Sequence, residues 1–144
     1  MPERRGAIIS QAYAWLRTPY HHEAMVMGVG VDCAMLLVAV YHGAGLIPPI
    51  DPRPYPPDWM LHRSEERYLG WVRQYAHPVG SPLPGDIAVY QFGRVVAHAA
   101  IVVDWPRIIH AYRPAGMVIL GDGAAGVLEH RLRGFWRLNQ FREA

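Results

Sequence analysis

A proline-rich segment in the first half of the chain constrains the fold most. Residues 47–57 read IPPIDPRPYPP and contain six prolines. Because proline lacks a backbone N–H and fixes its own φ angle, this stretch cannot lie inside a helix or a central strand. The sequence has 144 residues, which is the size of one globular domain. We therefore expect a single domain over residues 1–144, with a proline-rich connection at about 47–57 between its two halves.

Helical patterns flank the prolines. Apolar residues recur at helical spacing over residues 8–16. Asp32 is a good N-cap for a second helix, which runs through CAMLLVAVYHG to Gly43 or Gly45. Because this helix is apolar on nearly all sides, we expect it to be the buried central helix. A surface helix is expected over residues 59–75, where charged and apolar side chains mix.

The second half of the chain shows β-strand patterns. The clearest three are residues 86–92 (DIAVYQF), 94–104 (RVVAHAAIVVD) and 107–112 (RIIHAY). We expect them to form consecutive antiparallel strands joined by short turns. Two or three further strands are expected in MVIL, VLEHRL and GFWRLNQF, at residues 117–120, 127–132 and 134–141. Helices first and strands second predict an α+β fold, with N-terminal helices packed on a five- to six-stranded antiparallel sheet.

Charge and hydropathy exclude several classes of protein. Fourteen arginines, with no lysine, oppose twelve acidic residues, so the net charge is +2. The arginines are scattered, which argues against a nucleic-acid-binding arm. Residues 24–41 are apolar except for Asp32, but this aspartate and two glycines make a transmembrane segment unfavourable. The first residues lack the apolar core of a secretory signal, so we expect cytoplasmic synthesis without a signal peptide.

The chain contains one cysteine, Cys33. A lone cysteine excludes an intramolecular disulfide framework and a multi-cysteine zinc site. Cys33 directly follows the predicted N-cap, and in the first turn of a helix the unpaired amides and the helix dipole favour a thiolate. Free cysteine is also among the most frequently buried residue types, so packing in the core is the alternative to a nucleophilic role.

Two histidines interrupt apolar strands, His98 in VVAHAAIVV and His110 in RIIHAY. Their relation depends on the turn between the two strands. If this turn has an odd number of residues, for instance three with Val103 paired to Arg107, both imidazoles lie on one face within hydrogen-bonding reach. A two-residue turn would place them on opposite faces of the sheet.

A base that deprotonates a thiol, itself oriented by a third group, is the general arrangement of an activated nucleophile. Cys33, His98 and His110 can fill these three roles in that order. The same side chains could instead bind zinc, with one position left open for water. We rank zinc second, because the cysteine lies on a helix far away in sequence and no carboxylate accompanies the histidines at ligand spacing.

The ordered set of motifs resembles the NlpC-type cysteine peptidases of bacterial cell walls, a papain-like superfamily. Residues 18–46 (TPYHHEAMVMGVGVDCAMLLVAVYHGAGL) are similar to the nucleophile region of that family. Residues 83–104 (LPGDIAVYQFGRVVAHAAIVVD) resemble its histidine strand, and RIIHAY resembles the strand with its third polar residue. The proline-rich segment with DWMLHRSEERYLGWV, and the closing GFWRL, resemble the version encoded in phage tail and gene-transfer-agent clusters.

The resemblance implies a papain-like fold and roles for five residues. Cys33 is then the nucleophile, His98 the base that later protonates the leaving amine, and His110 the residue that orients His98. Tyr20 matches the tyrosine that helps the Cys33 backbone amide to stabilise the oxyanion. Asp32 matches the aspartate that caps the helix and meets a substrate amine. These roles need neither a metal nor another cofactor.

The sequence departs from the family pattern at two places. Ala34-Met35 replace the usual Ser-Gly after the nucleophile, and His21-His22-Glu23 replace the usual Trp-Gly-Gly after the tyrosine. Ala34 removes a hydroxyl that could bind substrate, and Met35 adds bulk at the start of the helix. We therefore expect the catalytic groups to be kept and the substrate contacts to differ.

The expected function is hydrolysis of an amide bond in the peptide stem of peptidoglycan, through a thioester intermediate. The resemblance also implies a phage or prophage protein that travels with a tail to the cell wall, with tail proteins as partners. Because the net charge is weak, we expect a partner to supply the targeting. One alternative is a structural tail-assembly or wall-binding module with a vestigial triad. Another is acyl transfer to a lipid or amine acceptor, which needs a broad apolar groove.

Overall fold

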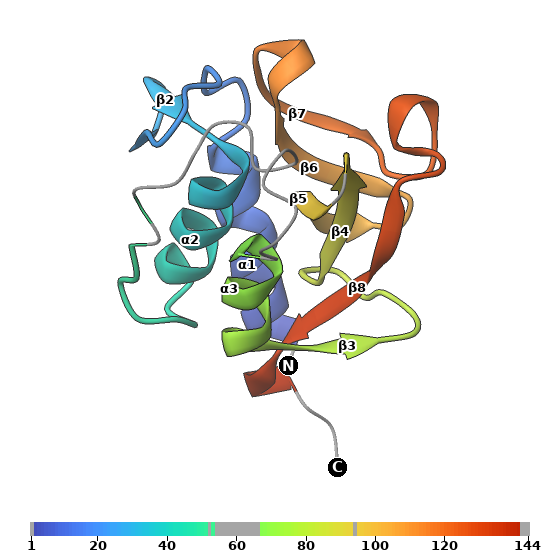
Figure 1. Ribbon diagram of the computed structural model, residues 1–144. Helices are drawn as coiled ribbons and strands as arrows, with labels where there is room; N and C mark the ends of the chain where they lie inside the picture. Colours follow the sequence, from blue (N-terminus) through green and yellow to red (C-terminus); the bar gives the residue numbers. More distant parts are fainter. Residues whose placement is uncertain (1, 52, 54–66, 94, 142–144) are drawn as a thin grey trace.

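The structure of the protein is a computed structural model that describes residues 2–51, 53, 67–93 and 95–141. Within these residues, three helices lie against a six-stranded antiparallel sheet (Figure 1). The expected α+β architecture, with N-terminal helices on an antiparallel sheet, is therefore confirmed. No helix in the described ranges is long and apolar enough to cross a membrane.

The three helices are α1 (Pro2–Ala14), α2 (Cys33–Gly43) and α3 (Arg67–Tyr75). Two short strands, β1 (Met25–Val26) and β2 (Gly30–Val31), form a hairpin between α1 and α2. The main sheet has the order β3-β8-β4-β5-β6-β7. Its strands are β3 (Ala76–Val79), β4 (Ile87–Phe92), β5 (Val95–Asp104), β6 (Arg107–Tyr112), β7 (Met117–Asp122) and β8 (Leu132–Leu138). Short 3₁₀ turns follow the last three strands, namely η2 (Arg113–Ala115), η3 (Gly126–Leu128) and η4 (Asn139–Phe141).

The central position of α2 follows from its sequence. Asp32 caps the helix, because its Oδ1 accepts a hydrogen bond from the backbone N–H of Met35 at 2.9 Å. Seven residues of the helix are buried. They are covered by α1 on one side and by β5 and β6 on another. The structure therefore has the expected buried central helix, and it ends at Gly43.

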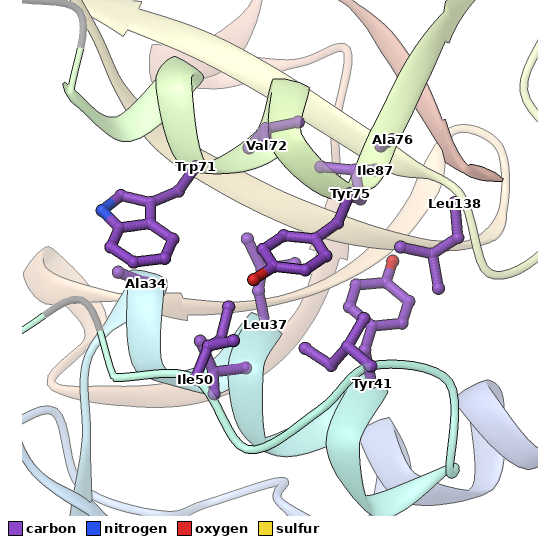
Figure 2. A pocket seen from close by; sticks show the side chains of 12 residues that line it. Ala34, Leu37, Tyr41, Ile50, Trp71, Val72, Tyr75, Ala76, Ile87 and Leu138 are labelled. Carbon is purple, nitrogen blue, oxygen red and sulfur yellow. The ribbon is translucent and has the colours of Figure 1, made fainter.

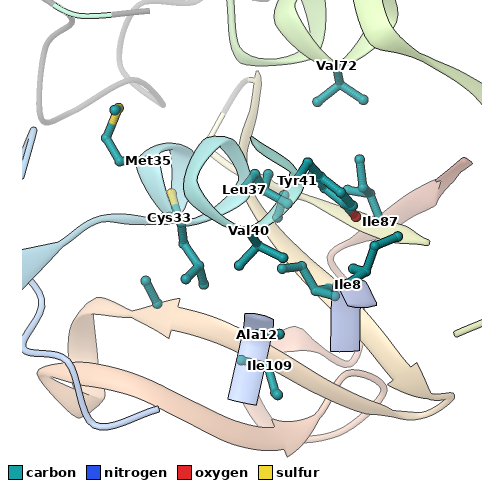
Figure 3. Packing of buried hydrophobic residues seen from close by; sticks show 14 of the residues in the cluster. Ile8, Ala12, Cys33, Met35, Leu37, Val40, Tyr41, Val72, Ile87 and Ile109 are labelled. Atoms are coloured by element: carbon teal, nitrogen blue, oxygen red, sulfur yellow. The ribbon is translucent and has the colours of Figure 1, made fainter. Parts of the chain in front are cut away.

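Two hydrophobic clusters pack on the sheet. The larger one lies between the helices and the sheet (Figure 3), where Ile8 and Ala12 of α1 and Ile109 of β6 are completely buried. Alternate positions of the same strands form the smaller cluster, with Ala100 of β5 and Ile108 of β6 among its members. Because side chains alternate along a strand, the smaller cluster lies on the opposite face of the sheet.

The structure corrects the expected surface helix. The helix α3 covers residues 67–75 of the predicted range, and residues 59–66 lie outside the described residues, as do four of the six prolines of the 47–57 connection. The helix is also not merely a surface element. Val72 is 7% exposed and belongs to the larger cluster, so one side of α3 contributes to the core.

The predicted strand over residues 127–132 is wrong. Gly126, with a φ angle of 62°, begins a turn in which its carbonyl accepts the N–H of Glu129 at 3.2 Å. The strand β8 begins only at Leu132. Conversely, the sequence did not predict β3, because Pro78 interrupts the pattern. This strand pairs with β8 alone at the edge of the sheet, where a proline is tolerated.

Candidate active site

Cys33 is the first residue of α2 and is 9% exposed. Its thiol donates a hydrogen bond to the backbone carbonyl of Ala97, with Sγ and O 3.7 Å apart. The register between β4 and β5 shifts after Tyr90, which leaves Ala97 as the extra residue of a β-bulge next to His98. Bulges of this kind redirect neighbouring side chains and are common beside active sites. The start of α2 thus meets the strand that carries His98 at this bulge.

His98 and His110 are hydrogen bonded to each other. Nε2 of His98 and Nδ1 of His110 are 2.8 Å apart. Both residues are buried, with exposed fractions of 7% and 2%. The two imidazoles therefore lie on the same face of the sheet, which is the arrangement that the sequence predicts for an odd-numbered turn.

The turn that produces this shared face differs from the prediction. Only two residues, Trp105 and Pro106, separate the paired residues Asp104 and Arg107. A bulge at Val103 then restores the register in which Ile101 pairs with Ile109 and Val102 with Ile108. This is the register that a three-residue turn would give. A two-residue turn was expected to place the histidines on opposite faces of the sheet. That expectation is wrong, because the bulge at Val103 adds the third residue that the shared face requires.

Aromatic rings surround the histidine pair. The ring centroids of Tyr90 and Phe92 each lie 5.8 Å from that of His98, and Tyr112 stacks on His110 at 4.8 Å. Burial, and then the neighbouring His110, lower the pKa of His98 below its ordinary value. Burial also lowers the pKa of His110. Both imidazoles are therefore neutral at pH 7, so one ring donates the shared hydrogen bond and the other accepts it.

The hydrogen bond decides which nitrogen of His98 can act as a base. Nε2 of His98 is engaged with His110, so Nδ1 is the nitrogen that remains for another partner. When Nδ1 of His98 is unprotonated, Nε2 carries the hydrogen and donates it to Nδ1 of His110. In that state His110 fixes the tautomer and the orientation of His98.

Tyr20 lies next to Cys33 and is held there by the backbone. The N–H of Tyr20 donates to the carbonyl of Gly116 at 2.8 Å, and the N–H of Val31 donates to the carbonyl of Pro19 at 3.0 Å. The Tyr20 side chain is hydrogen bonded to Cys33. Burial first, and then the charges of Cys33 and Asp32, raise the pKa of Tyr20 above its ordinary value. The phenol thus keeps its proton and can donate a hydrogen bond.

Asp32 is 2% exposed and uses both of its oxygens. Oδ1 accepts the N–H of Met35 at 2.9 Å, and Oδ2 accepts the N–H of Glu23 at 2.8 Å. Nδ1 of His22 also lies 3.8 Å from Oδ2. Asp32 therefore has the capping position that the sequence predicts, and it also ties the segment after Tyr20 to the start of α2.

One cleft of about 290 Å³ brings most of these side chains together. Tyr20, Asp32, Cys33 and His98 line it, whereas His110 lies behind His98. Sequence reasoning missed other residues of its wall, which are Phe92 of β4, Ala97 of β5, Ala111 and Tyr112 at the end of β6, Arg113 and Pro114 of η2, and Val127 of η3. The sequence shows that Arg113 directly follows the strand that carries His110, but not that it reaches the cleft.

Some of the residues that depart from the family pattern line the cleft, and others do not. Ala34 and His22 line the cleft, and His21 is not among its lining residues. Met35 is completely buried in the larger cluster (Figure 3). The expectation that Met35 changes substrate contacts is therefore wrong, since its side chain packs in the core.

Ala34 also lines a separate apolar pocket of about 60 Å³ between α2 and α3 (Figure 2). Trp71 and Tyr75 of α3 extend into this pocket from one side, and Leu37 of α2 lies on the other. Such a volume holds only a few water-sized groups. It is too small for a long acyl chain, so this pocket is not the broad apolar groove that acyl transfer to a lipid needs.

The zinc alternative fails on geometry. In the part of the chain that the structure describes, no group of three or more His, Cys, Asp or Glu side chains is placed to hold a metal ion. His98 and His110 direct ring nitrogens at each other at 2.8 Å. Cys33, His98 and His110 therefore do not form a three-ligand zinc site.

Comparison with known proteins finds similar structures but no similar sequence. No protein-family model matches the sequence, and no curated protein is significantly similar to it. A Bacillus cereus protein of the NlpC/P60 family superposes with a TM-score of 0.67 at 18% identity, over 93% of this chain and 40% of that one. The NlpC/p60 domain of the peptidoglycan hydrolase SagA gives 0.61 at 20% identity, over 92% and 96%.

The chain has the NlpC/P60 fold. It spans two fifths of the Bacillus cereus protein and nearly all of the SagA domain. The same fold occurs in RipD of Mycobacterium tuberculosis, a non-catalytic NlpC/p60 domain protein, with a TM-score of 0.58 at 12% identity over 92% and 95%. The NlpC/P60 fold thus serves both hydrolases and non-catalytic proteins, and the chemistry of this chain depends on its own side chains.

Proposed function

We propose that the protein is a cysteine peptidase that hydrolyses an amide bond in the stem peptides of peptidoglycan through a thioester intermediate. One observation carries the proposal. His98 is hydrogen bonded to His110 at 2.8 Å and shares a cleft with Cys33 at the start of α2. The likeness to the NlpC/p60 domain of the peptidoglycan hydrolase SagA supports the choice of substrate.

The first step forms the nucleophile. Nδ1 of His98 takes the proton of the Cys33 thiol, and the resulting thiolate adds to the carbonyl carbon of the scissile amide. The N-terminal turn of α2 favours this thiolate, because its backbone dipoles point their positive ends at Cys33. His98 becomes an imidazolium whose Nε2–H donates to neutral His110. His110 therefore stabilises the His98 imidazolium although it carries no charge itself.

The second step breaks the C–N bond. The carbonyl oxygen becomes negative in the tetrahedral adduct and accepts hydrogen bonds from the Cys33 backbone N–H and the Tyr20 hydroxyl. The N–H of Cys33 suits this role, because the first four amides of a helix have no acceptor within it. When the adduct collapses, His98 gives its proton to the departing amine, and the acyl group stays on Sγ as a thioester.

The third step releases the acid. A water molecule gives a proton to Nδ1 of His98 while its oxygen adds to the thioester carbonyl. The same two donors, the Cys33 amide and Tyr20, stabilise the second oxyanion. The adduct then expels the Cys33 thiolate, which regains its proton from His98, and the new carboxylic acid leaves the cleft. This step returns every group to its starting state.

The second candidate function is a peptidoglycan-binding module without hydrolase activity. RipD favours it, because this non-catalytic protein adapted to peptidoglycan binding has the same fold. Ala34 also replaces a hydroxyl on the cleft wall. Against it stands the buried histidine pair, because burying two imidazoles opposes their protonation and lowers stability in acid, which a packing role does not require.

The sequence resemblance alone supports a further proposal about location. We propose that the protein is made in the cytoplasm and reaches the wall with a phage or prophage tail, with tail proteins as partners. The supporting residues are the proline-rich segment, the DWMLHRSEERYLGWV stretch and the closing GFWRL. Detection of the protein in purified tail particles would support this proposal, and its absence from them would refute it.

Digestion of purified peptidoglycan tests the proposed activity. The wild-type protein is expected to release stem-peptide fragments that carry one new amine and one new carboxyl end, identified by mass spectrometry. The Cys33→Ala variant is expected to lose at least about 10⁴-fold of the rate, because no other group can form the thioester. Its thermal unfolding should match the wild type, since the variant keeps Cβ and removes only the sulfur.

Alkylation provides the matching control. Iodoacetamide near neutral pH is expected to modify Cys33 rapidly and to abolish hydrolysis in parallel, because an activated thiolate reacts faster than an ordinary thiol. Hydrolysis by Cys33→Ala at the wild-type rate would exclude this mechanism. Tight binding to peptidoglycan by both proteins, with no fragments released by either, would favour the binding module.

A further inference from the structure

The cleft around Cys33 offers a substrate little exposed negative charge. Asp32 is the one acidic residue among the described residues of its wall. Its side chain is 2% exposed, and its two oxygens accept the backbone N–H groups of Met35 and Glu23. A substrate group that approaches Asp32 therefore meets a carboxylate that already has partners.

His22 adds a further partner to Asp32. Nδ1 of His22 lies 3.8 Å from Oδ2 of Asp32, and its Nε2 lies 3.3 Å from Oε1 of Glu23. The His22 side chain also lines the cleft. His22 therefore lies against both carboxylates, and a substrate amine that approaches Asp32 competes with its ring.

Arg113 is the one arginine among the described residues of the cleft wall. It is exposed at the first position of η2, directly after Tyr112. Its guanidinium makes no hydrogen bond or ion pair with any residue that the structure describes. Arg113 and Tyr20 line the same cleft. Burial raises the pKa of Tyr20 most, and the positive charge of Arg113 opposes that effect.

We propose that Arg113 is a specificity-determining residue that binds a carboxylate next to the scissile amide, and that no free amine is needed at Asp32. The inference rests on the proposed hydrolase function. The planar guanidinium presents paired N–H groups that match the two oxygens of a carboxylate. A carboxylate held there lies close to Tyr20, and hence close to the carbonyl that Cys33 attacks.

Synthetic peptides with one common scissile amide test this specificity. One pair carries a free carboxylate or a carboxamide on the acyl residue, and a second pair carries the same exchange on the leaving residue. A third pair has a free or an acetylated amino terminus. The measured quantity is kcat/KM for the wild type, Arg113→Gln and the control Arg107→Gln. Arg107 is exposed at the opposite end of β6, so the control loses the same charge away from the cleft.

The wild type is expected to prefer the carboxylate over the carboxamide by about tenfold within one of the first two pairs. That pair identifies whether the acyl or the leaving residue supplies the group. In Arg113→Gln the ratio is expected to fall to about 1, whereas Arg107→Gln keeps the wild-type ratio. Acetylation of the amino terminus is expected to change kcat/KM by less than about threefold.

Three results would overturn the inference while leaving the hydrolase in place. The first is cleavage without any preference for a carboxylate on either side. The second is an equal loss on all peptides in Arg113→Gln, which would assign the guanidinium to the oxyanion. The third is a strict requirement for a free amine. Failure of the wild type to cleave any peptide or peptidoglycan would instead overturn the hydrolase proposal, and this inference with it.

Discussion

The two ends of α2 hold buried polar side chains in opposite ways. At the N-terminal end, His98 and His110 share one hydrogen bond, and burial keeps both rings neutral. At the C-terminal end, the hydroxyl of Tyr41 donates to the carbonyl of Gly85 at 2.8 Å, beside the carboxylate of Asp86, which is 1% exposed. One end buries uncharged rings, and the other buries a charge.

The charge at the C-terminal end is fully matched. Nη2 of Arg137 lies 2.8 Å from Oδ2 of Asp86, and Nη1 of Arg5 lies 3.2 Å from Oδ1. The backbone N–H of Leu83 donates to Oδ2 at 2.8 Å. A buried carboxylate is tolerated only with partners of this kind. Asp86 is thus satisfied on every side, and neither the cleft nor the apolar pocket includes it.

Because of this difference, we expect the N-terminal end of α2 to serve the reaction and the C-terminal end to stabilise the fold. The histidine pair satisfies one nitrogen of His98 and leaves the other on the wall of a cleft, next to Cys33. The Asp86 cluster, which we define as Asp86, Arg5 and Arg137, leaves no oxygen for a ligand. Substitutions at the two ends of α2 should therefore have opposite effects on rate and on the free energy of unfolding.

The largest effect is expected for His98→Gln. Glutamine keeps a hydrogen-bonding group near His110 but cannot accept and return the proton of Cys33. We expect the rate of peptidoglycan hydrolysis to fall by about 10⁴-fold, equivalent to about 5 kcal/mol of activation free energy. The free energy of unfolding in urea should fall by less than about 2 kcal/mol.

The same exchange at an exposed site is the control for this variant. His130 lies in the turn before β8, with its side chain 89% exposed. His130→Gln is expected to change neither the rate nor the stability. A His98→Gln enzyme that keeps more than about a tenth of the wild-type rate would exclude His98 as the base.

Asp86→Ala should show the reverse pattern. Removal of the carboxylate leaves two half-buried arginine head groups without their anionic partner and the backbone N–H of Leu83 without its acceptor. We expect the free energy of unfolding to fall by about 3 to 5 kcal/mol, measured by urea denaturation. The rate per folded molecule should remain at the wild-type value, because the Asp86 cluster does not line the cleft.

Exposed Asp104 provides the matching control for this loss. Asp104→Ala removes the same group at the end of β5 and is expected to change stability by about 0.5 kcal/mol at most. A large loss of rate in folded Asp86→Ala would contradict the separation of the two ends of α2 and would connect the Asp86 cluster to the site.

The N-terminal end of α2 was predictable because its signals are local. The N-cap Asp32 and the first-turn Cys33 are adjacent in sequence, and the alternation of strand residues determines which side chains share a face. The hairpin shows the limit of such reasoning. A bulge at Val103 leaves the apolar alternation on either side unchanged, so the sequence made the shared face of His98 and His110 depend on a turn that it could not determine.

The Asp86 cluster at the C-terminal end of α2 could not be predicted from local signals. Arg5 and Arg137 are 81 and 51 residues away from Asp86, and no local pattern selects them as partners. Arg113 was missed for a related reason. Its position beside Tyr20 depends on a bridge between Pro19 and Met117, which joins segments from opposite ends of the chain. Tertiary packing decides both arrangements, and it cannot be deduced from periodicity.

The smallest expected effect is the change of the free energy of unfolding with pH. It also distinguishes the two ends of α2. Burial lowers the pKa of His98 and His110 in the folded state below the ordinary value of about 6.5. As pH falls below about 6.5, the unfolded chain binds protons that the folded chain excludes, so stability decreases, by at most about 1.4 kcal/mol per pH unit for each histidine. Above that pH both states are neutral at these rings, and the contribution is constant.

Urea denaturation at about pH 7 and about pH 5.5 measures this dependence, and ordinary carboxyl groups do not titrate in that window. The wild type is expected to lose stability between the two values, and His98→Gln to lose less, because one buried imidazole is gone. Asp86→Ala, although less stable throughout, should keep the wild-type difference. A wild-type stability that does not change over this window would mean that His98 and His110 bind protons in the fold as readily as in the unfolded chain, which would contradict their burial as neutral rings.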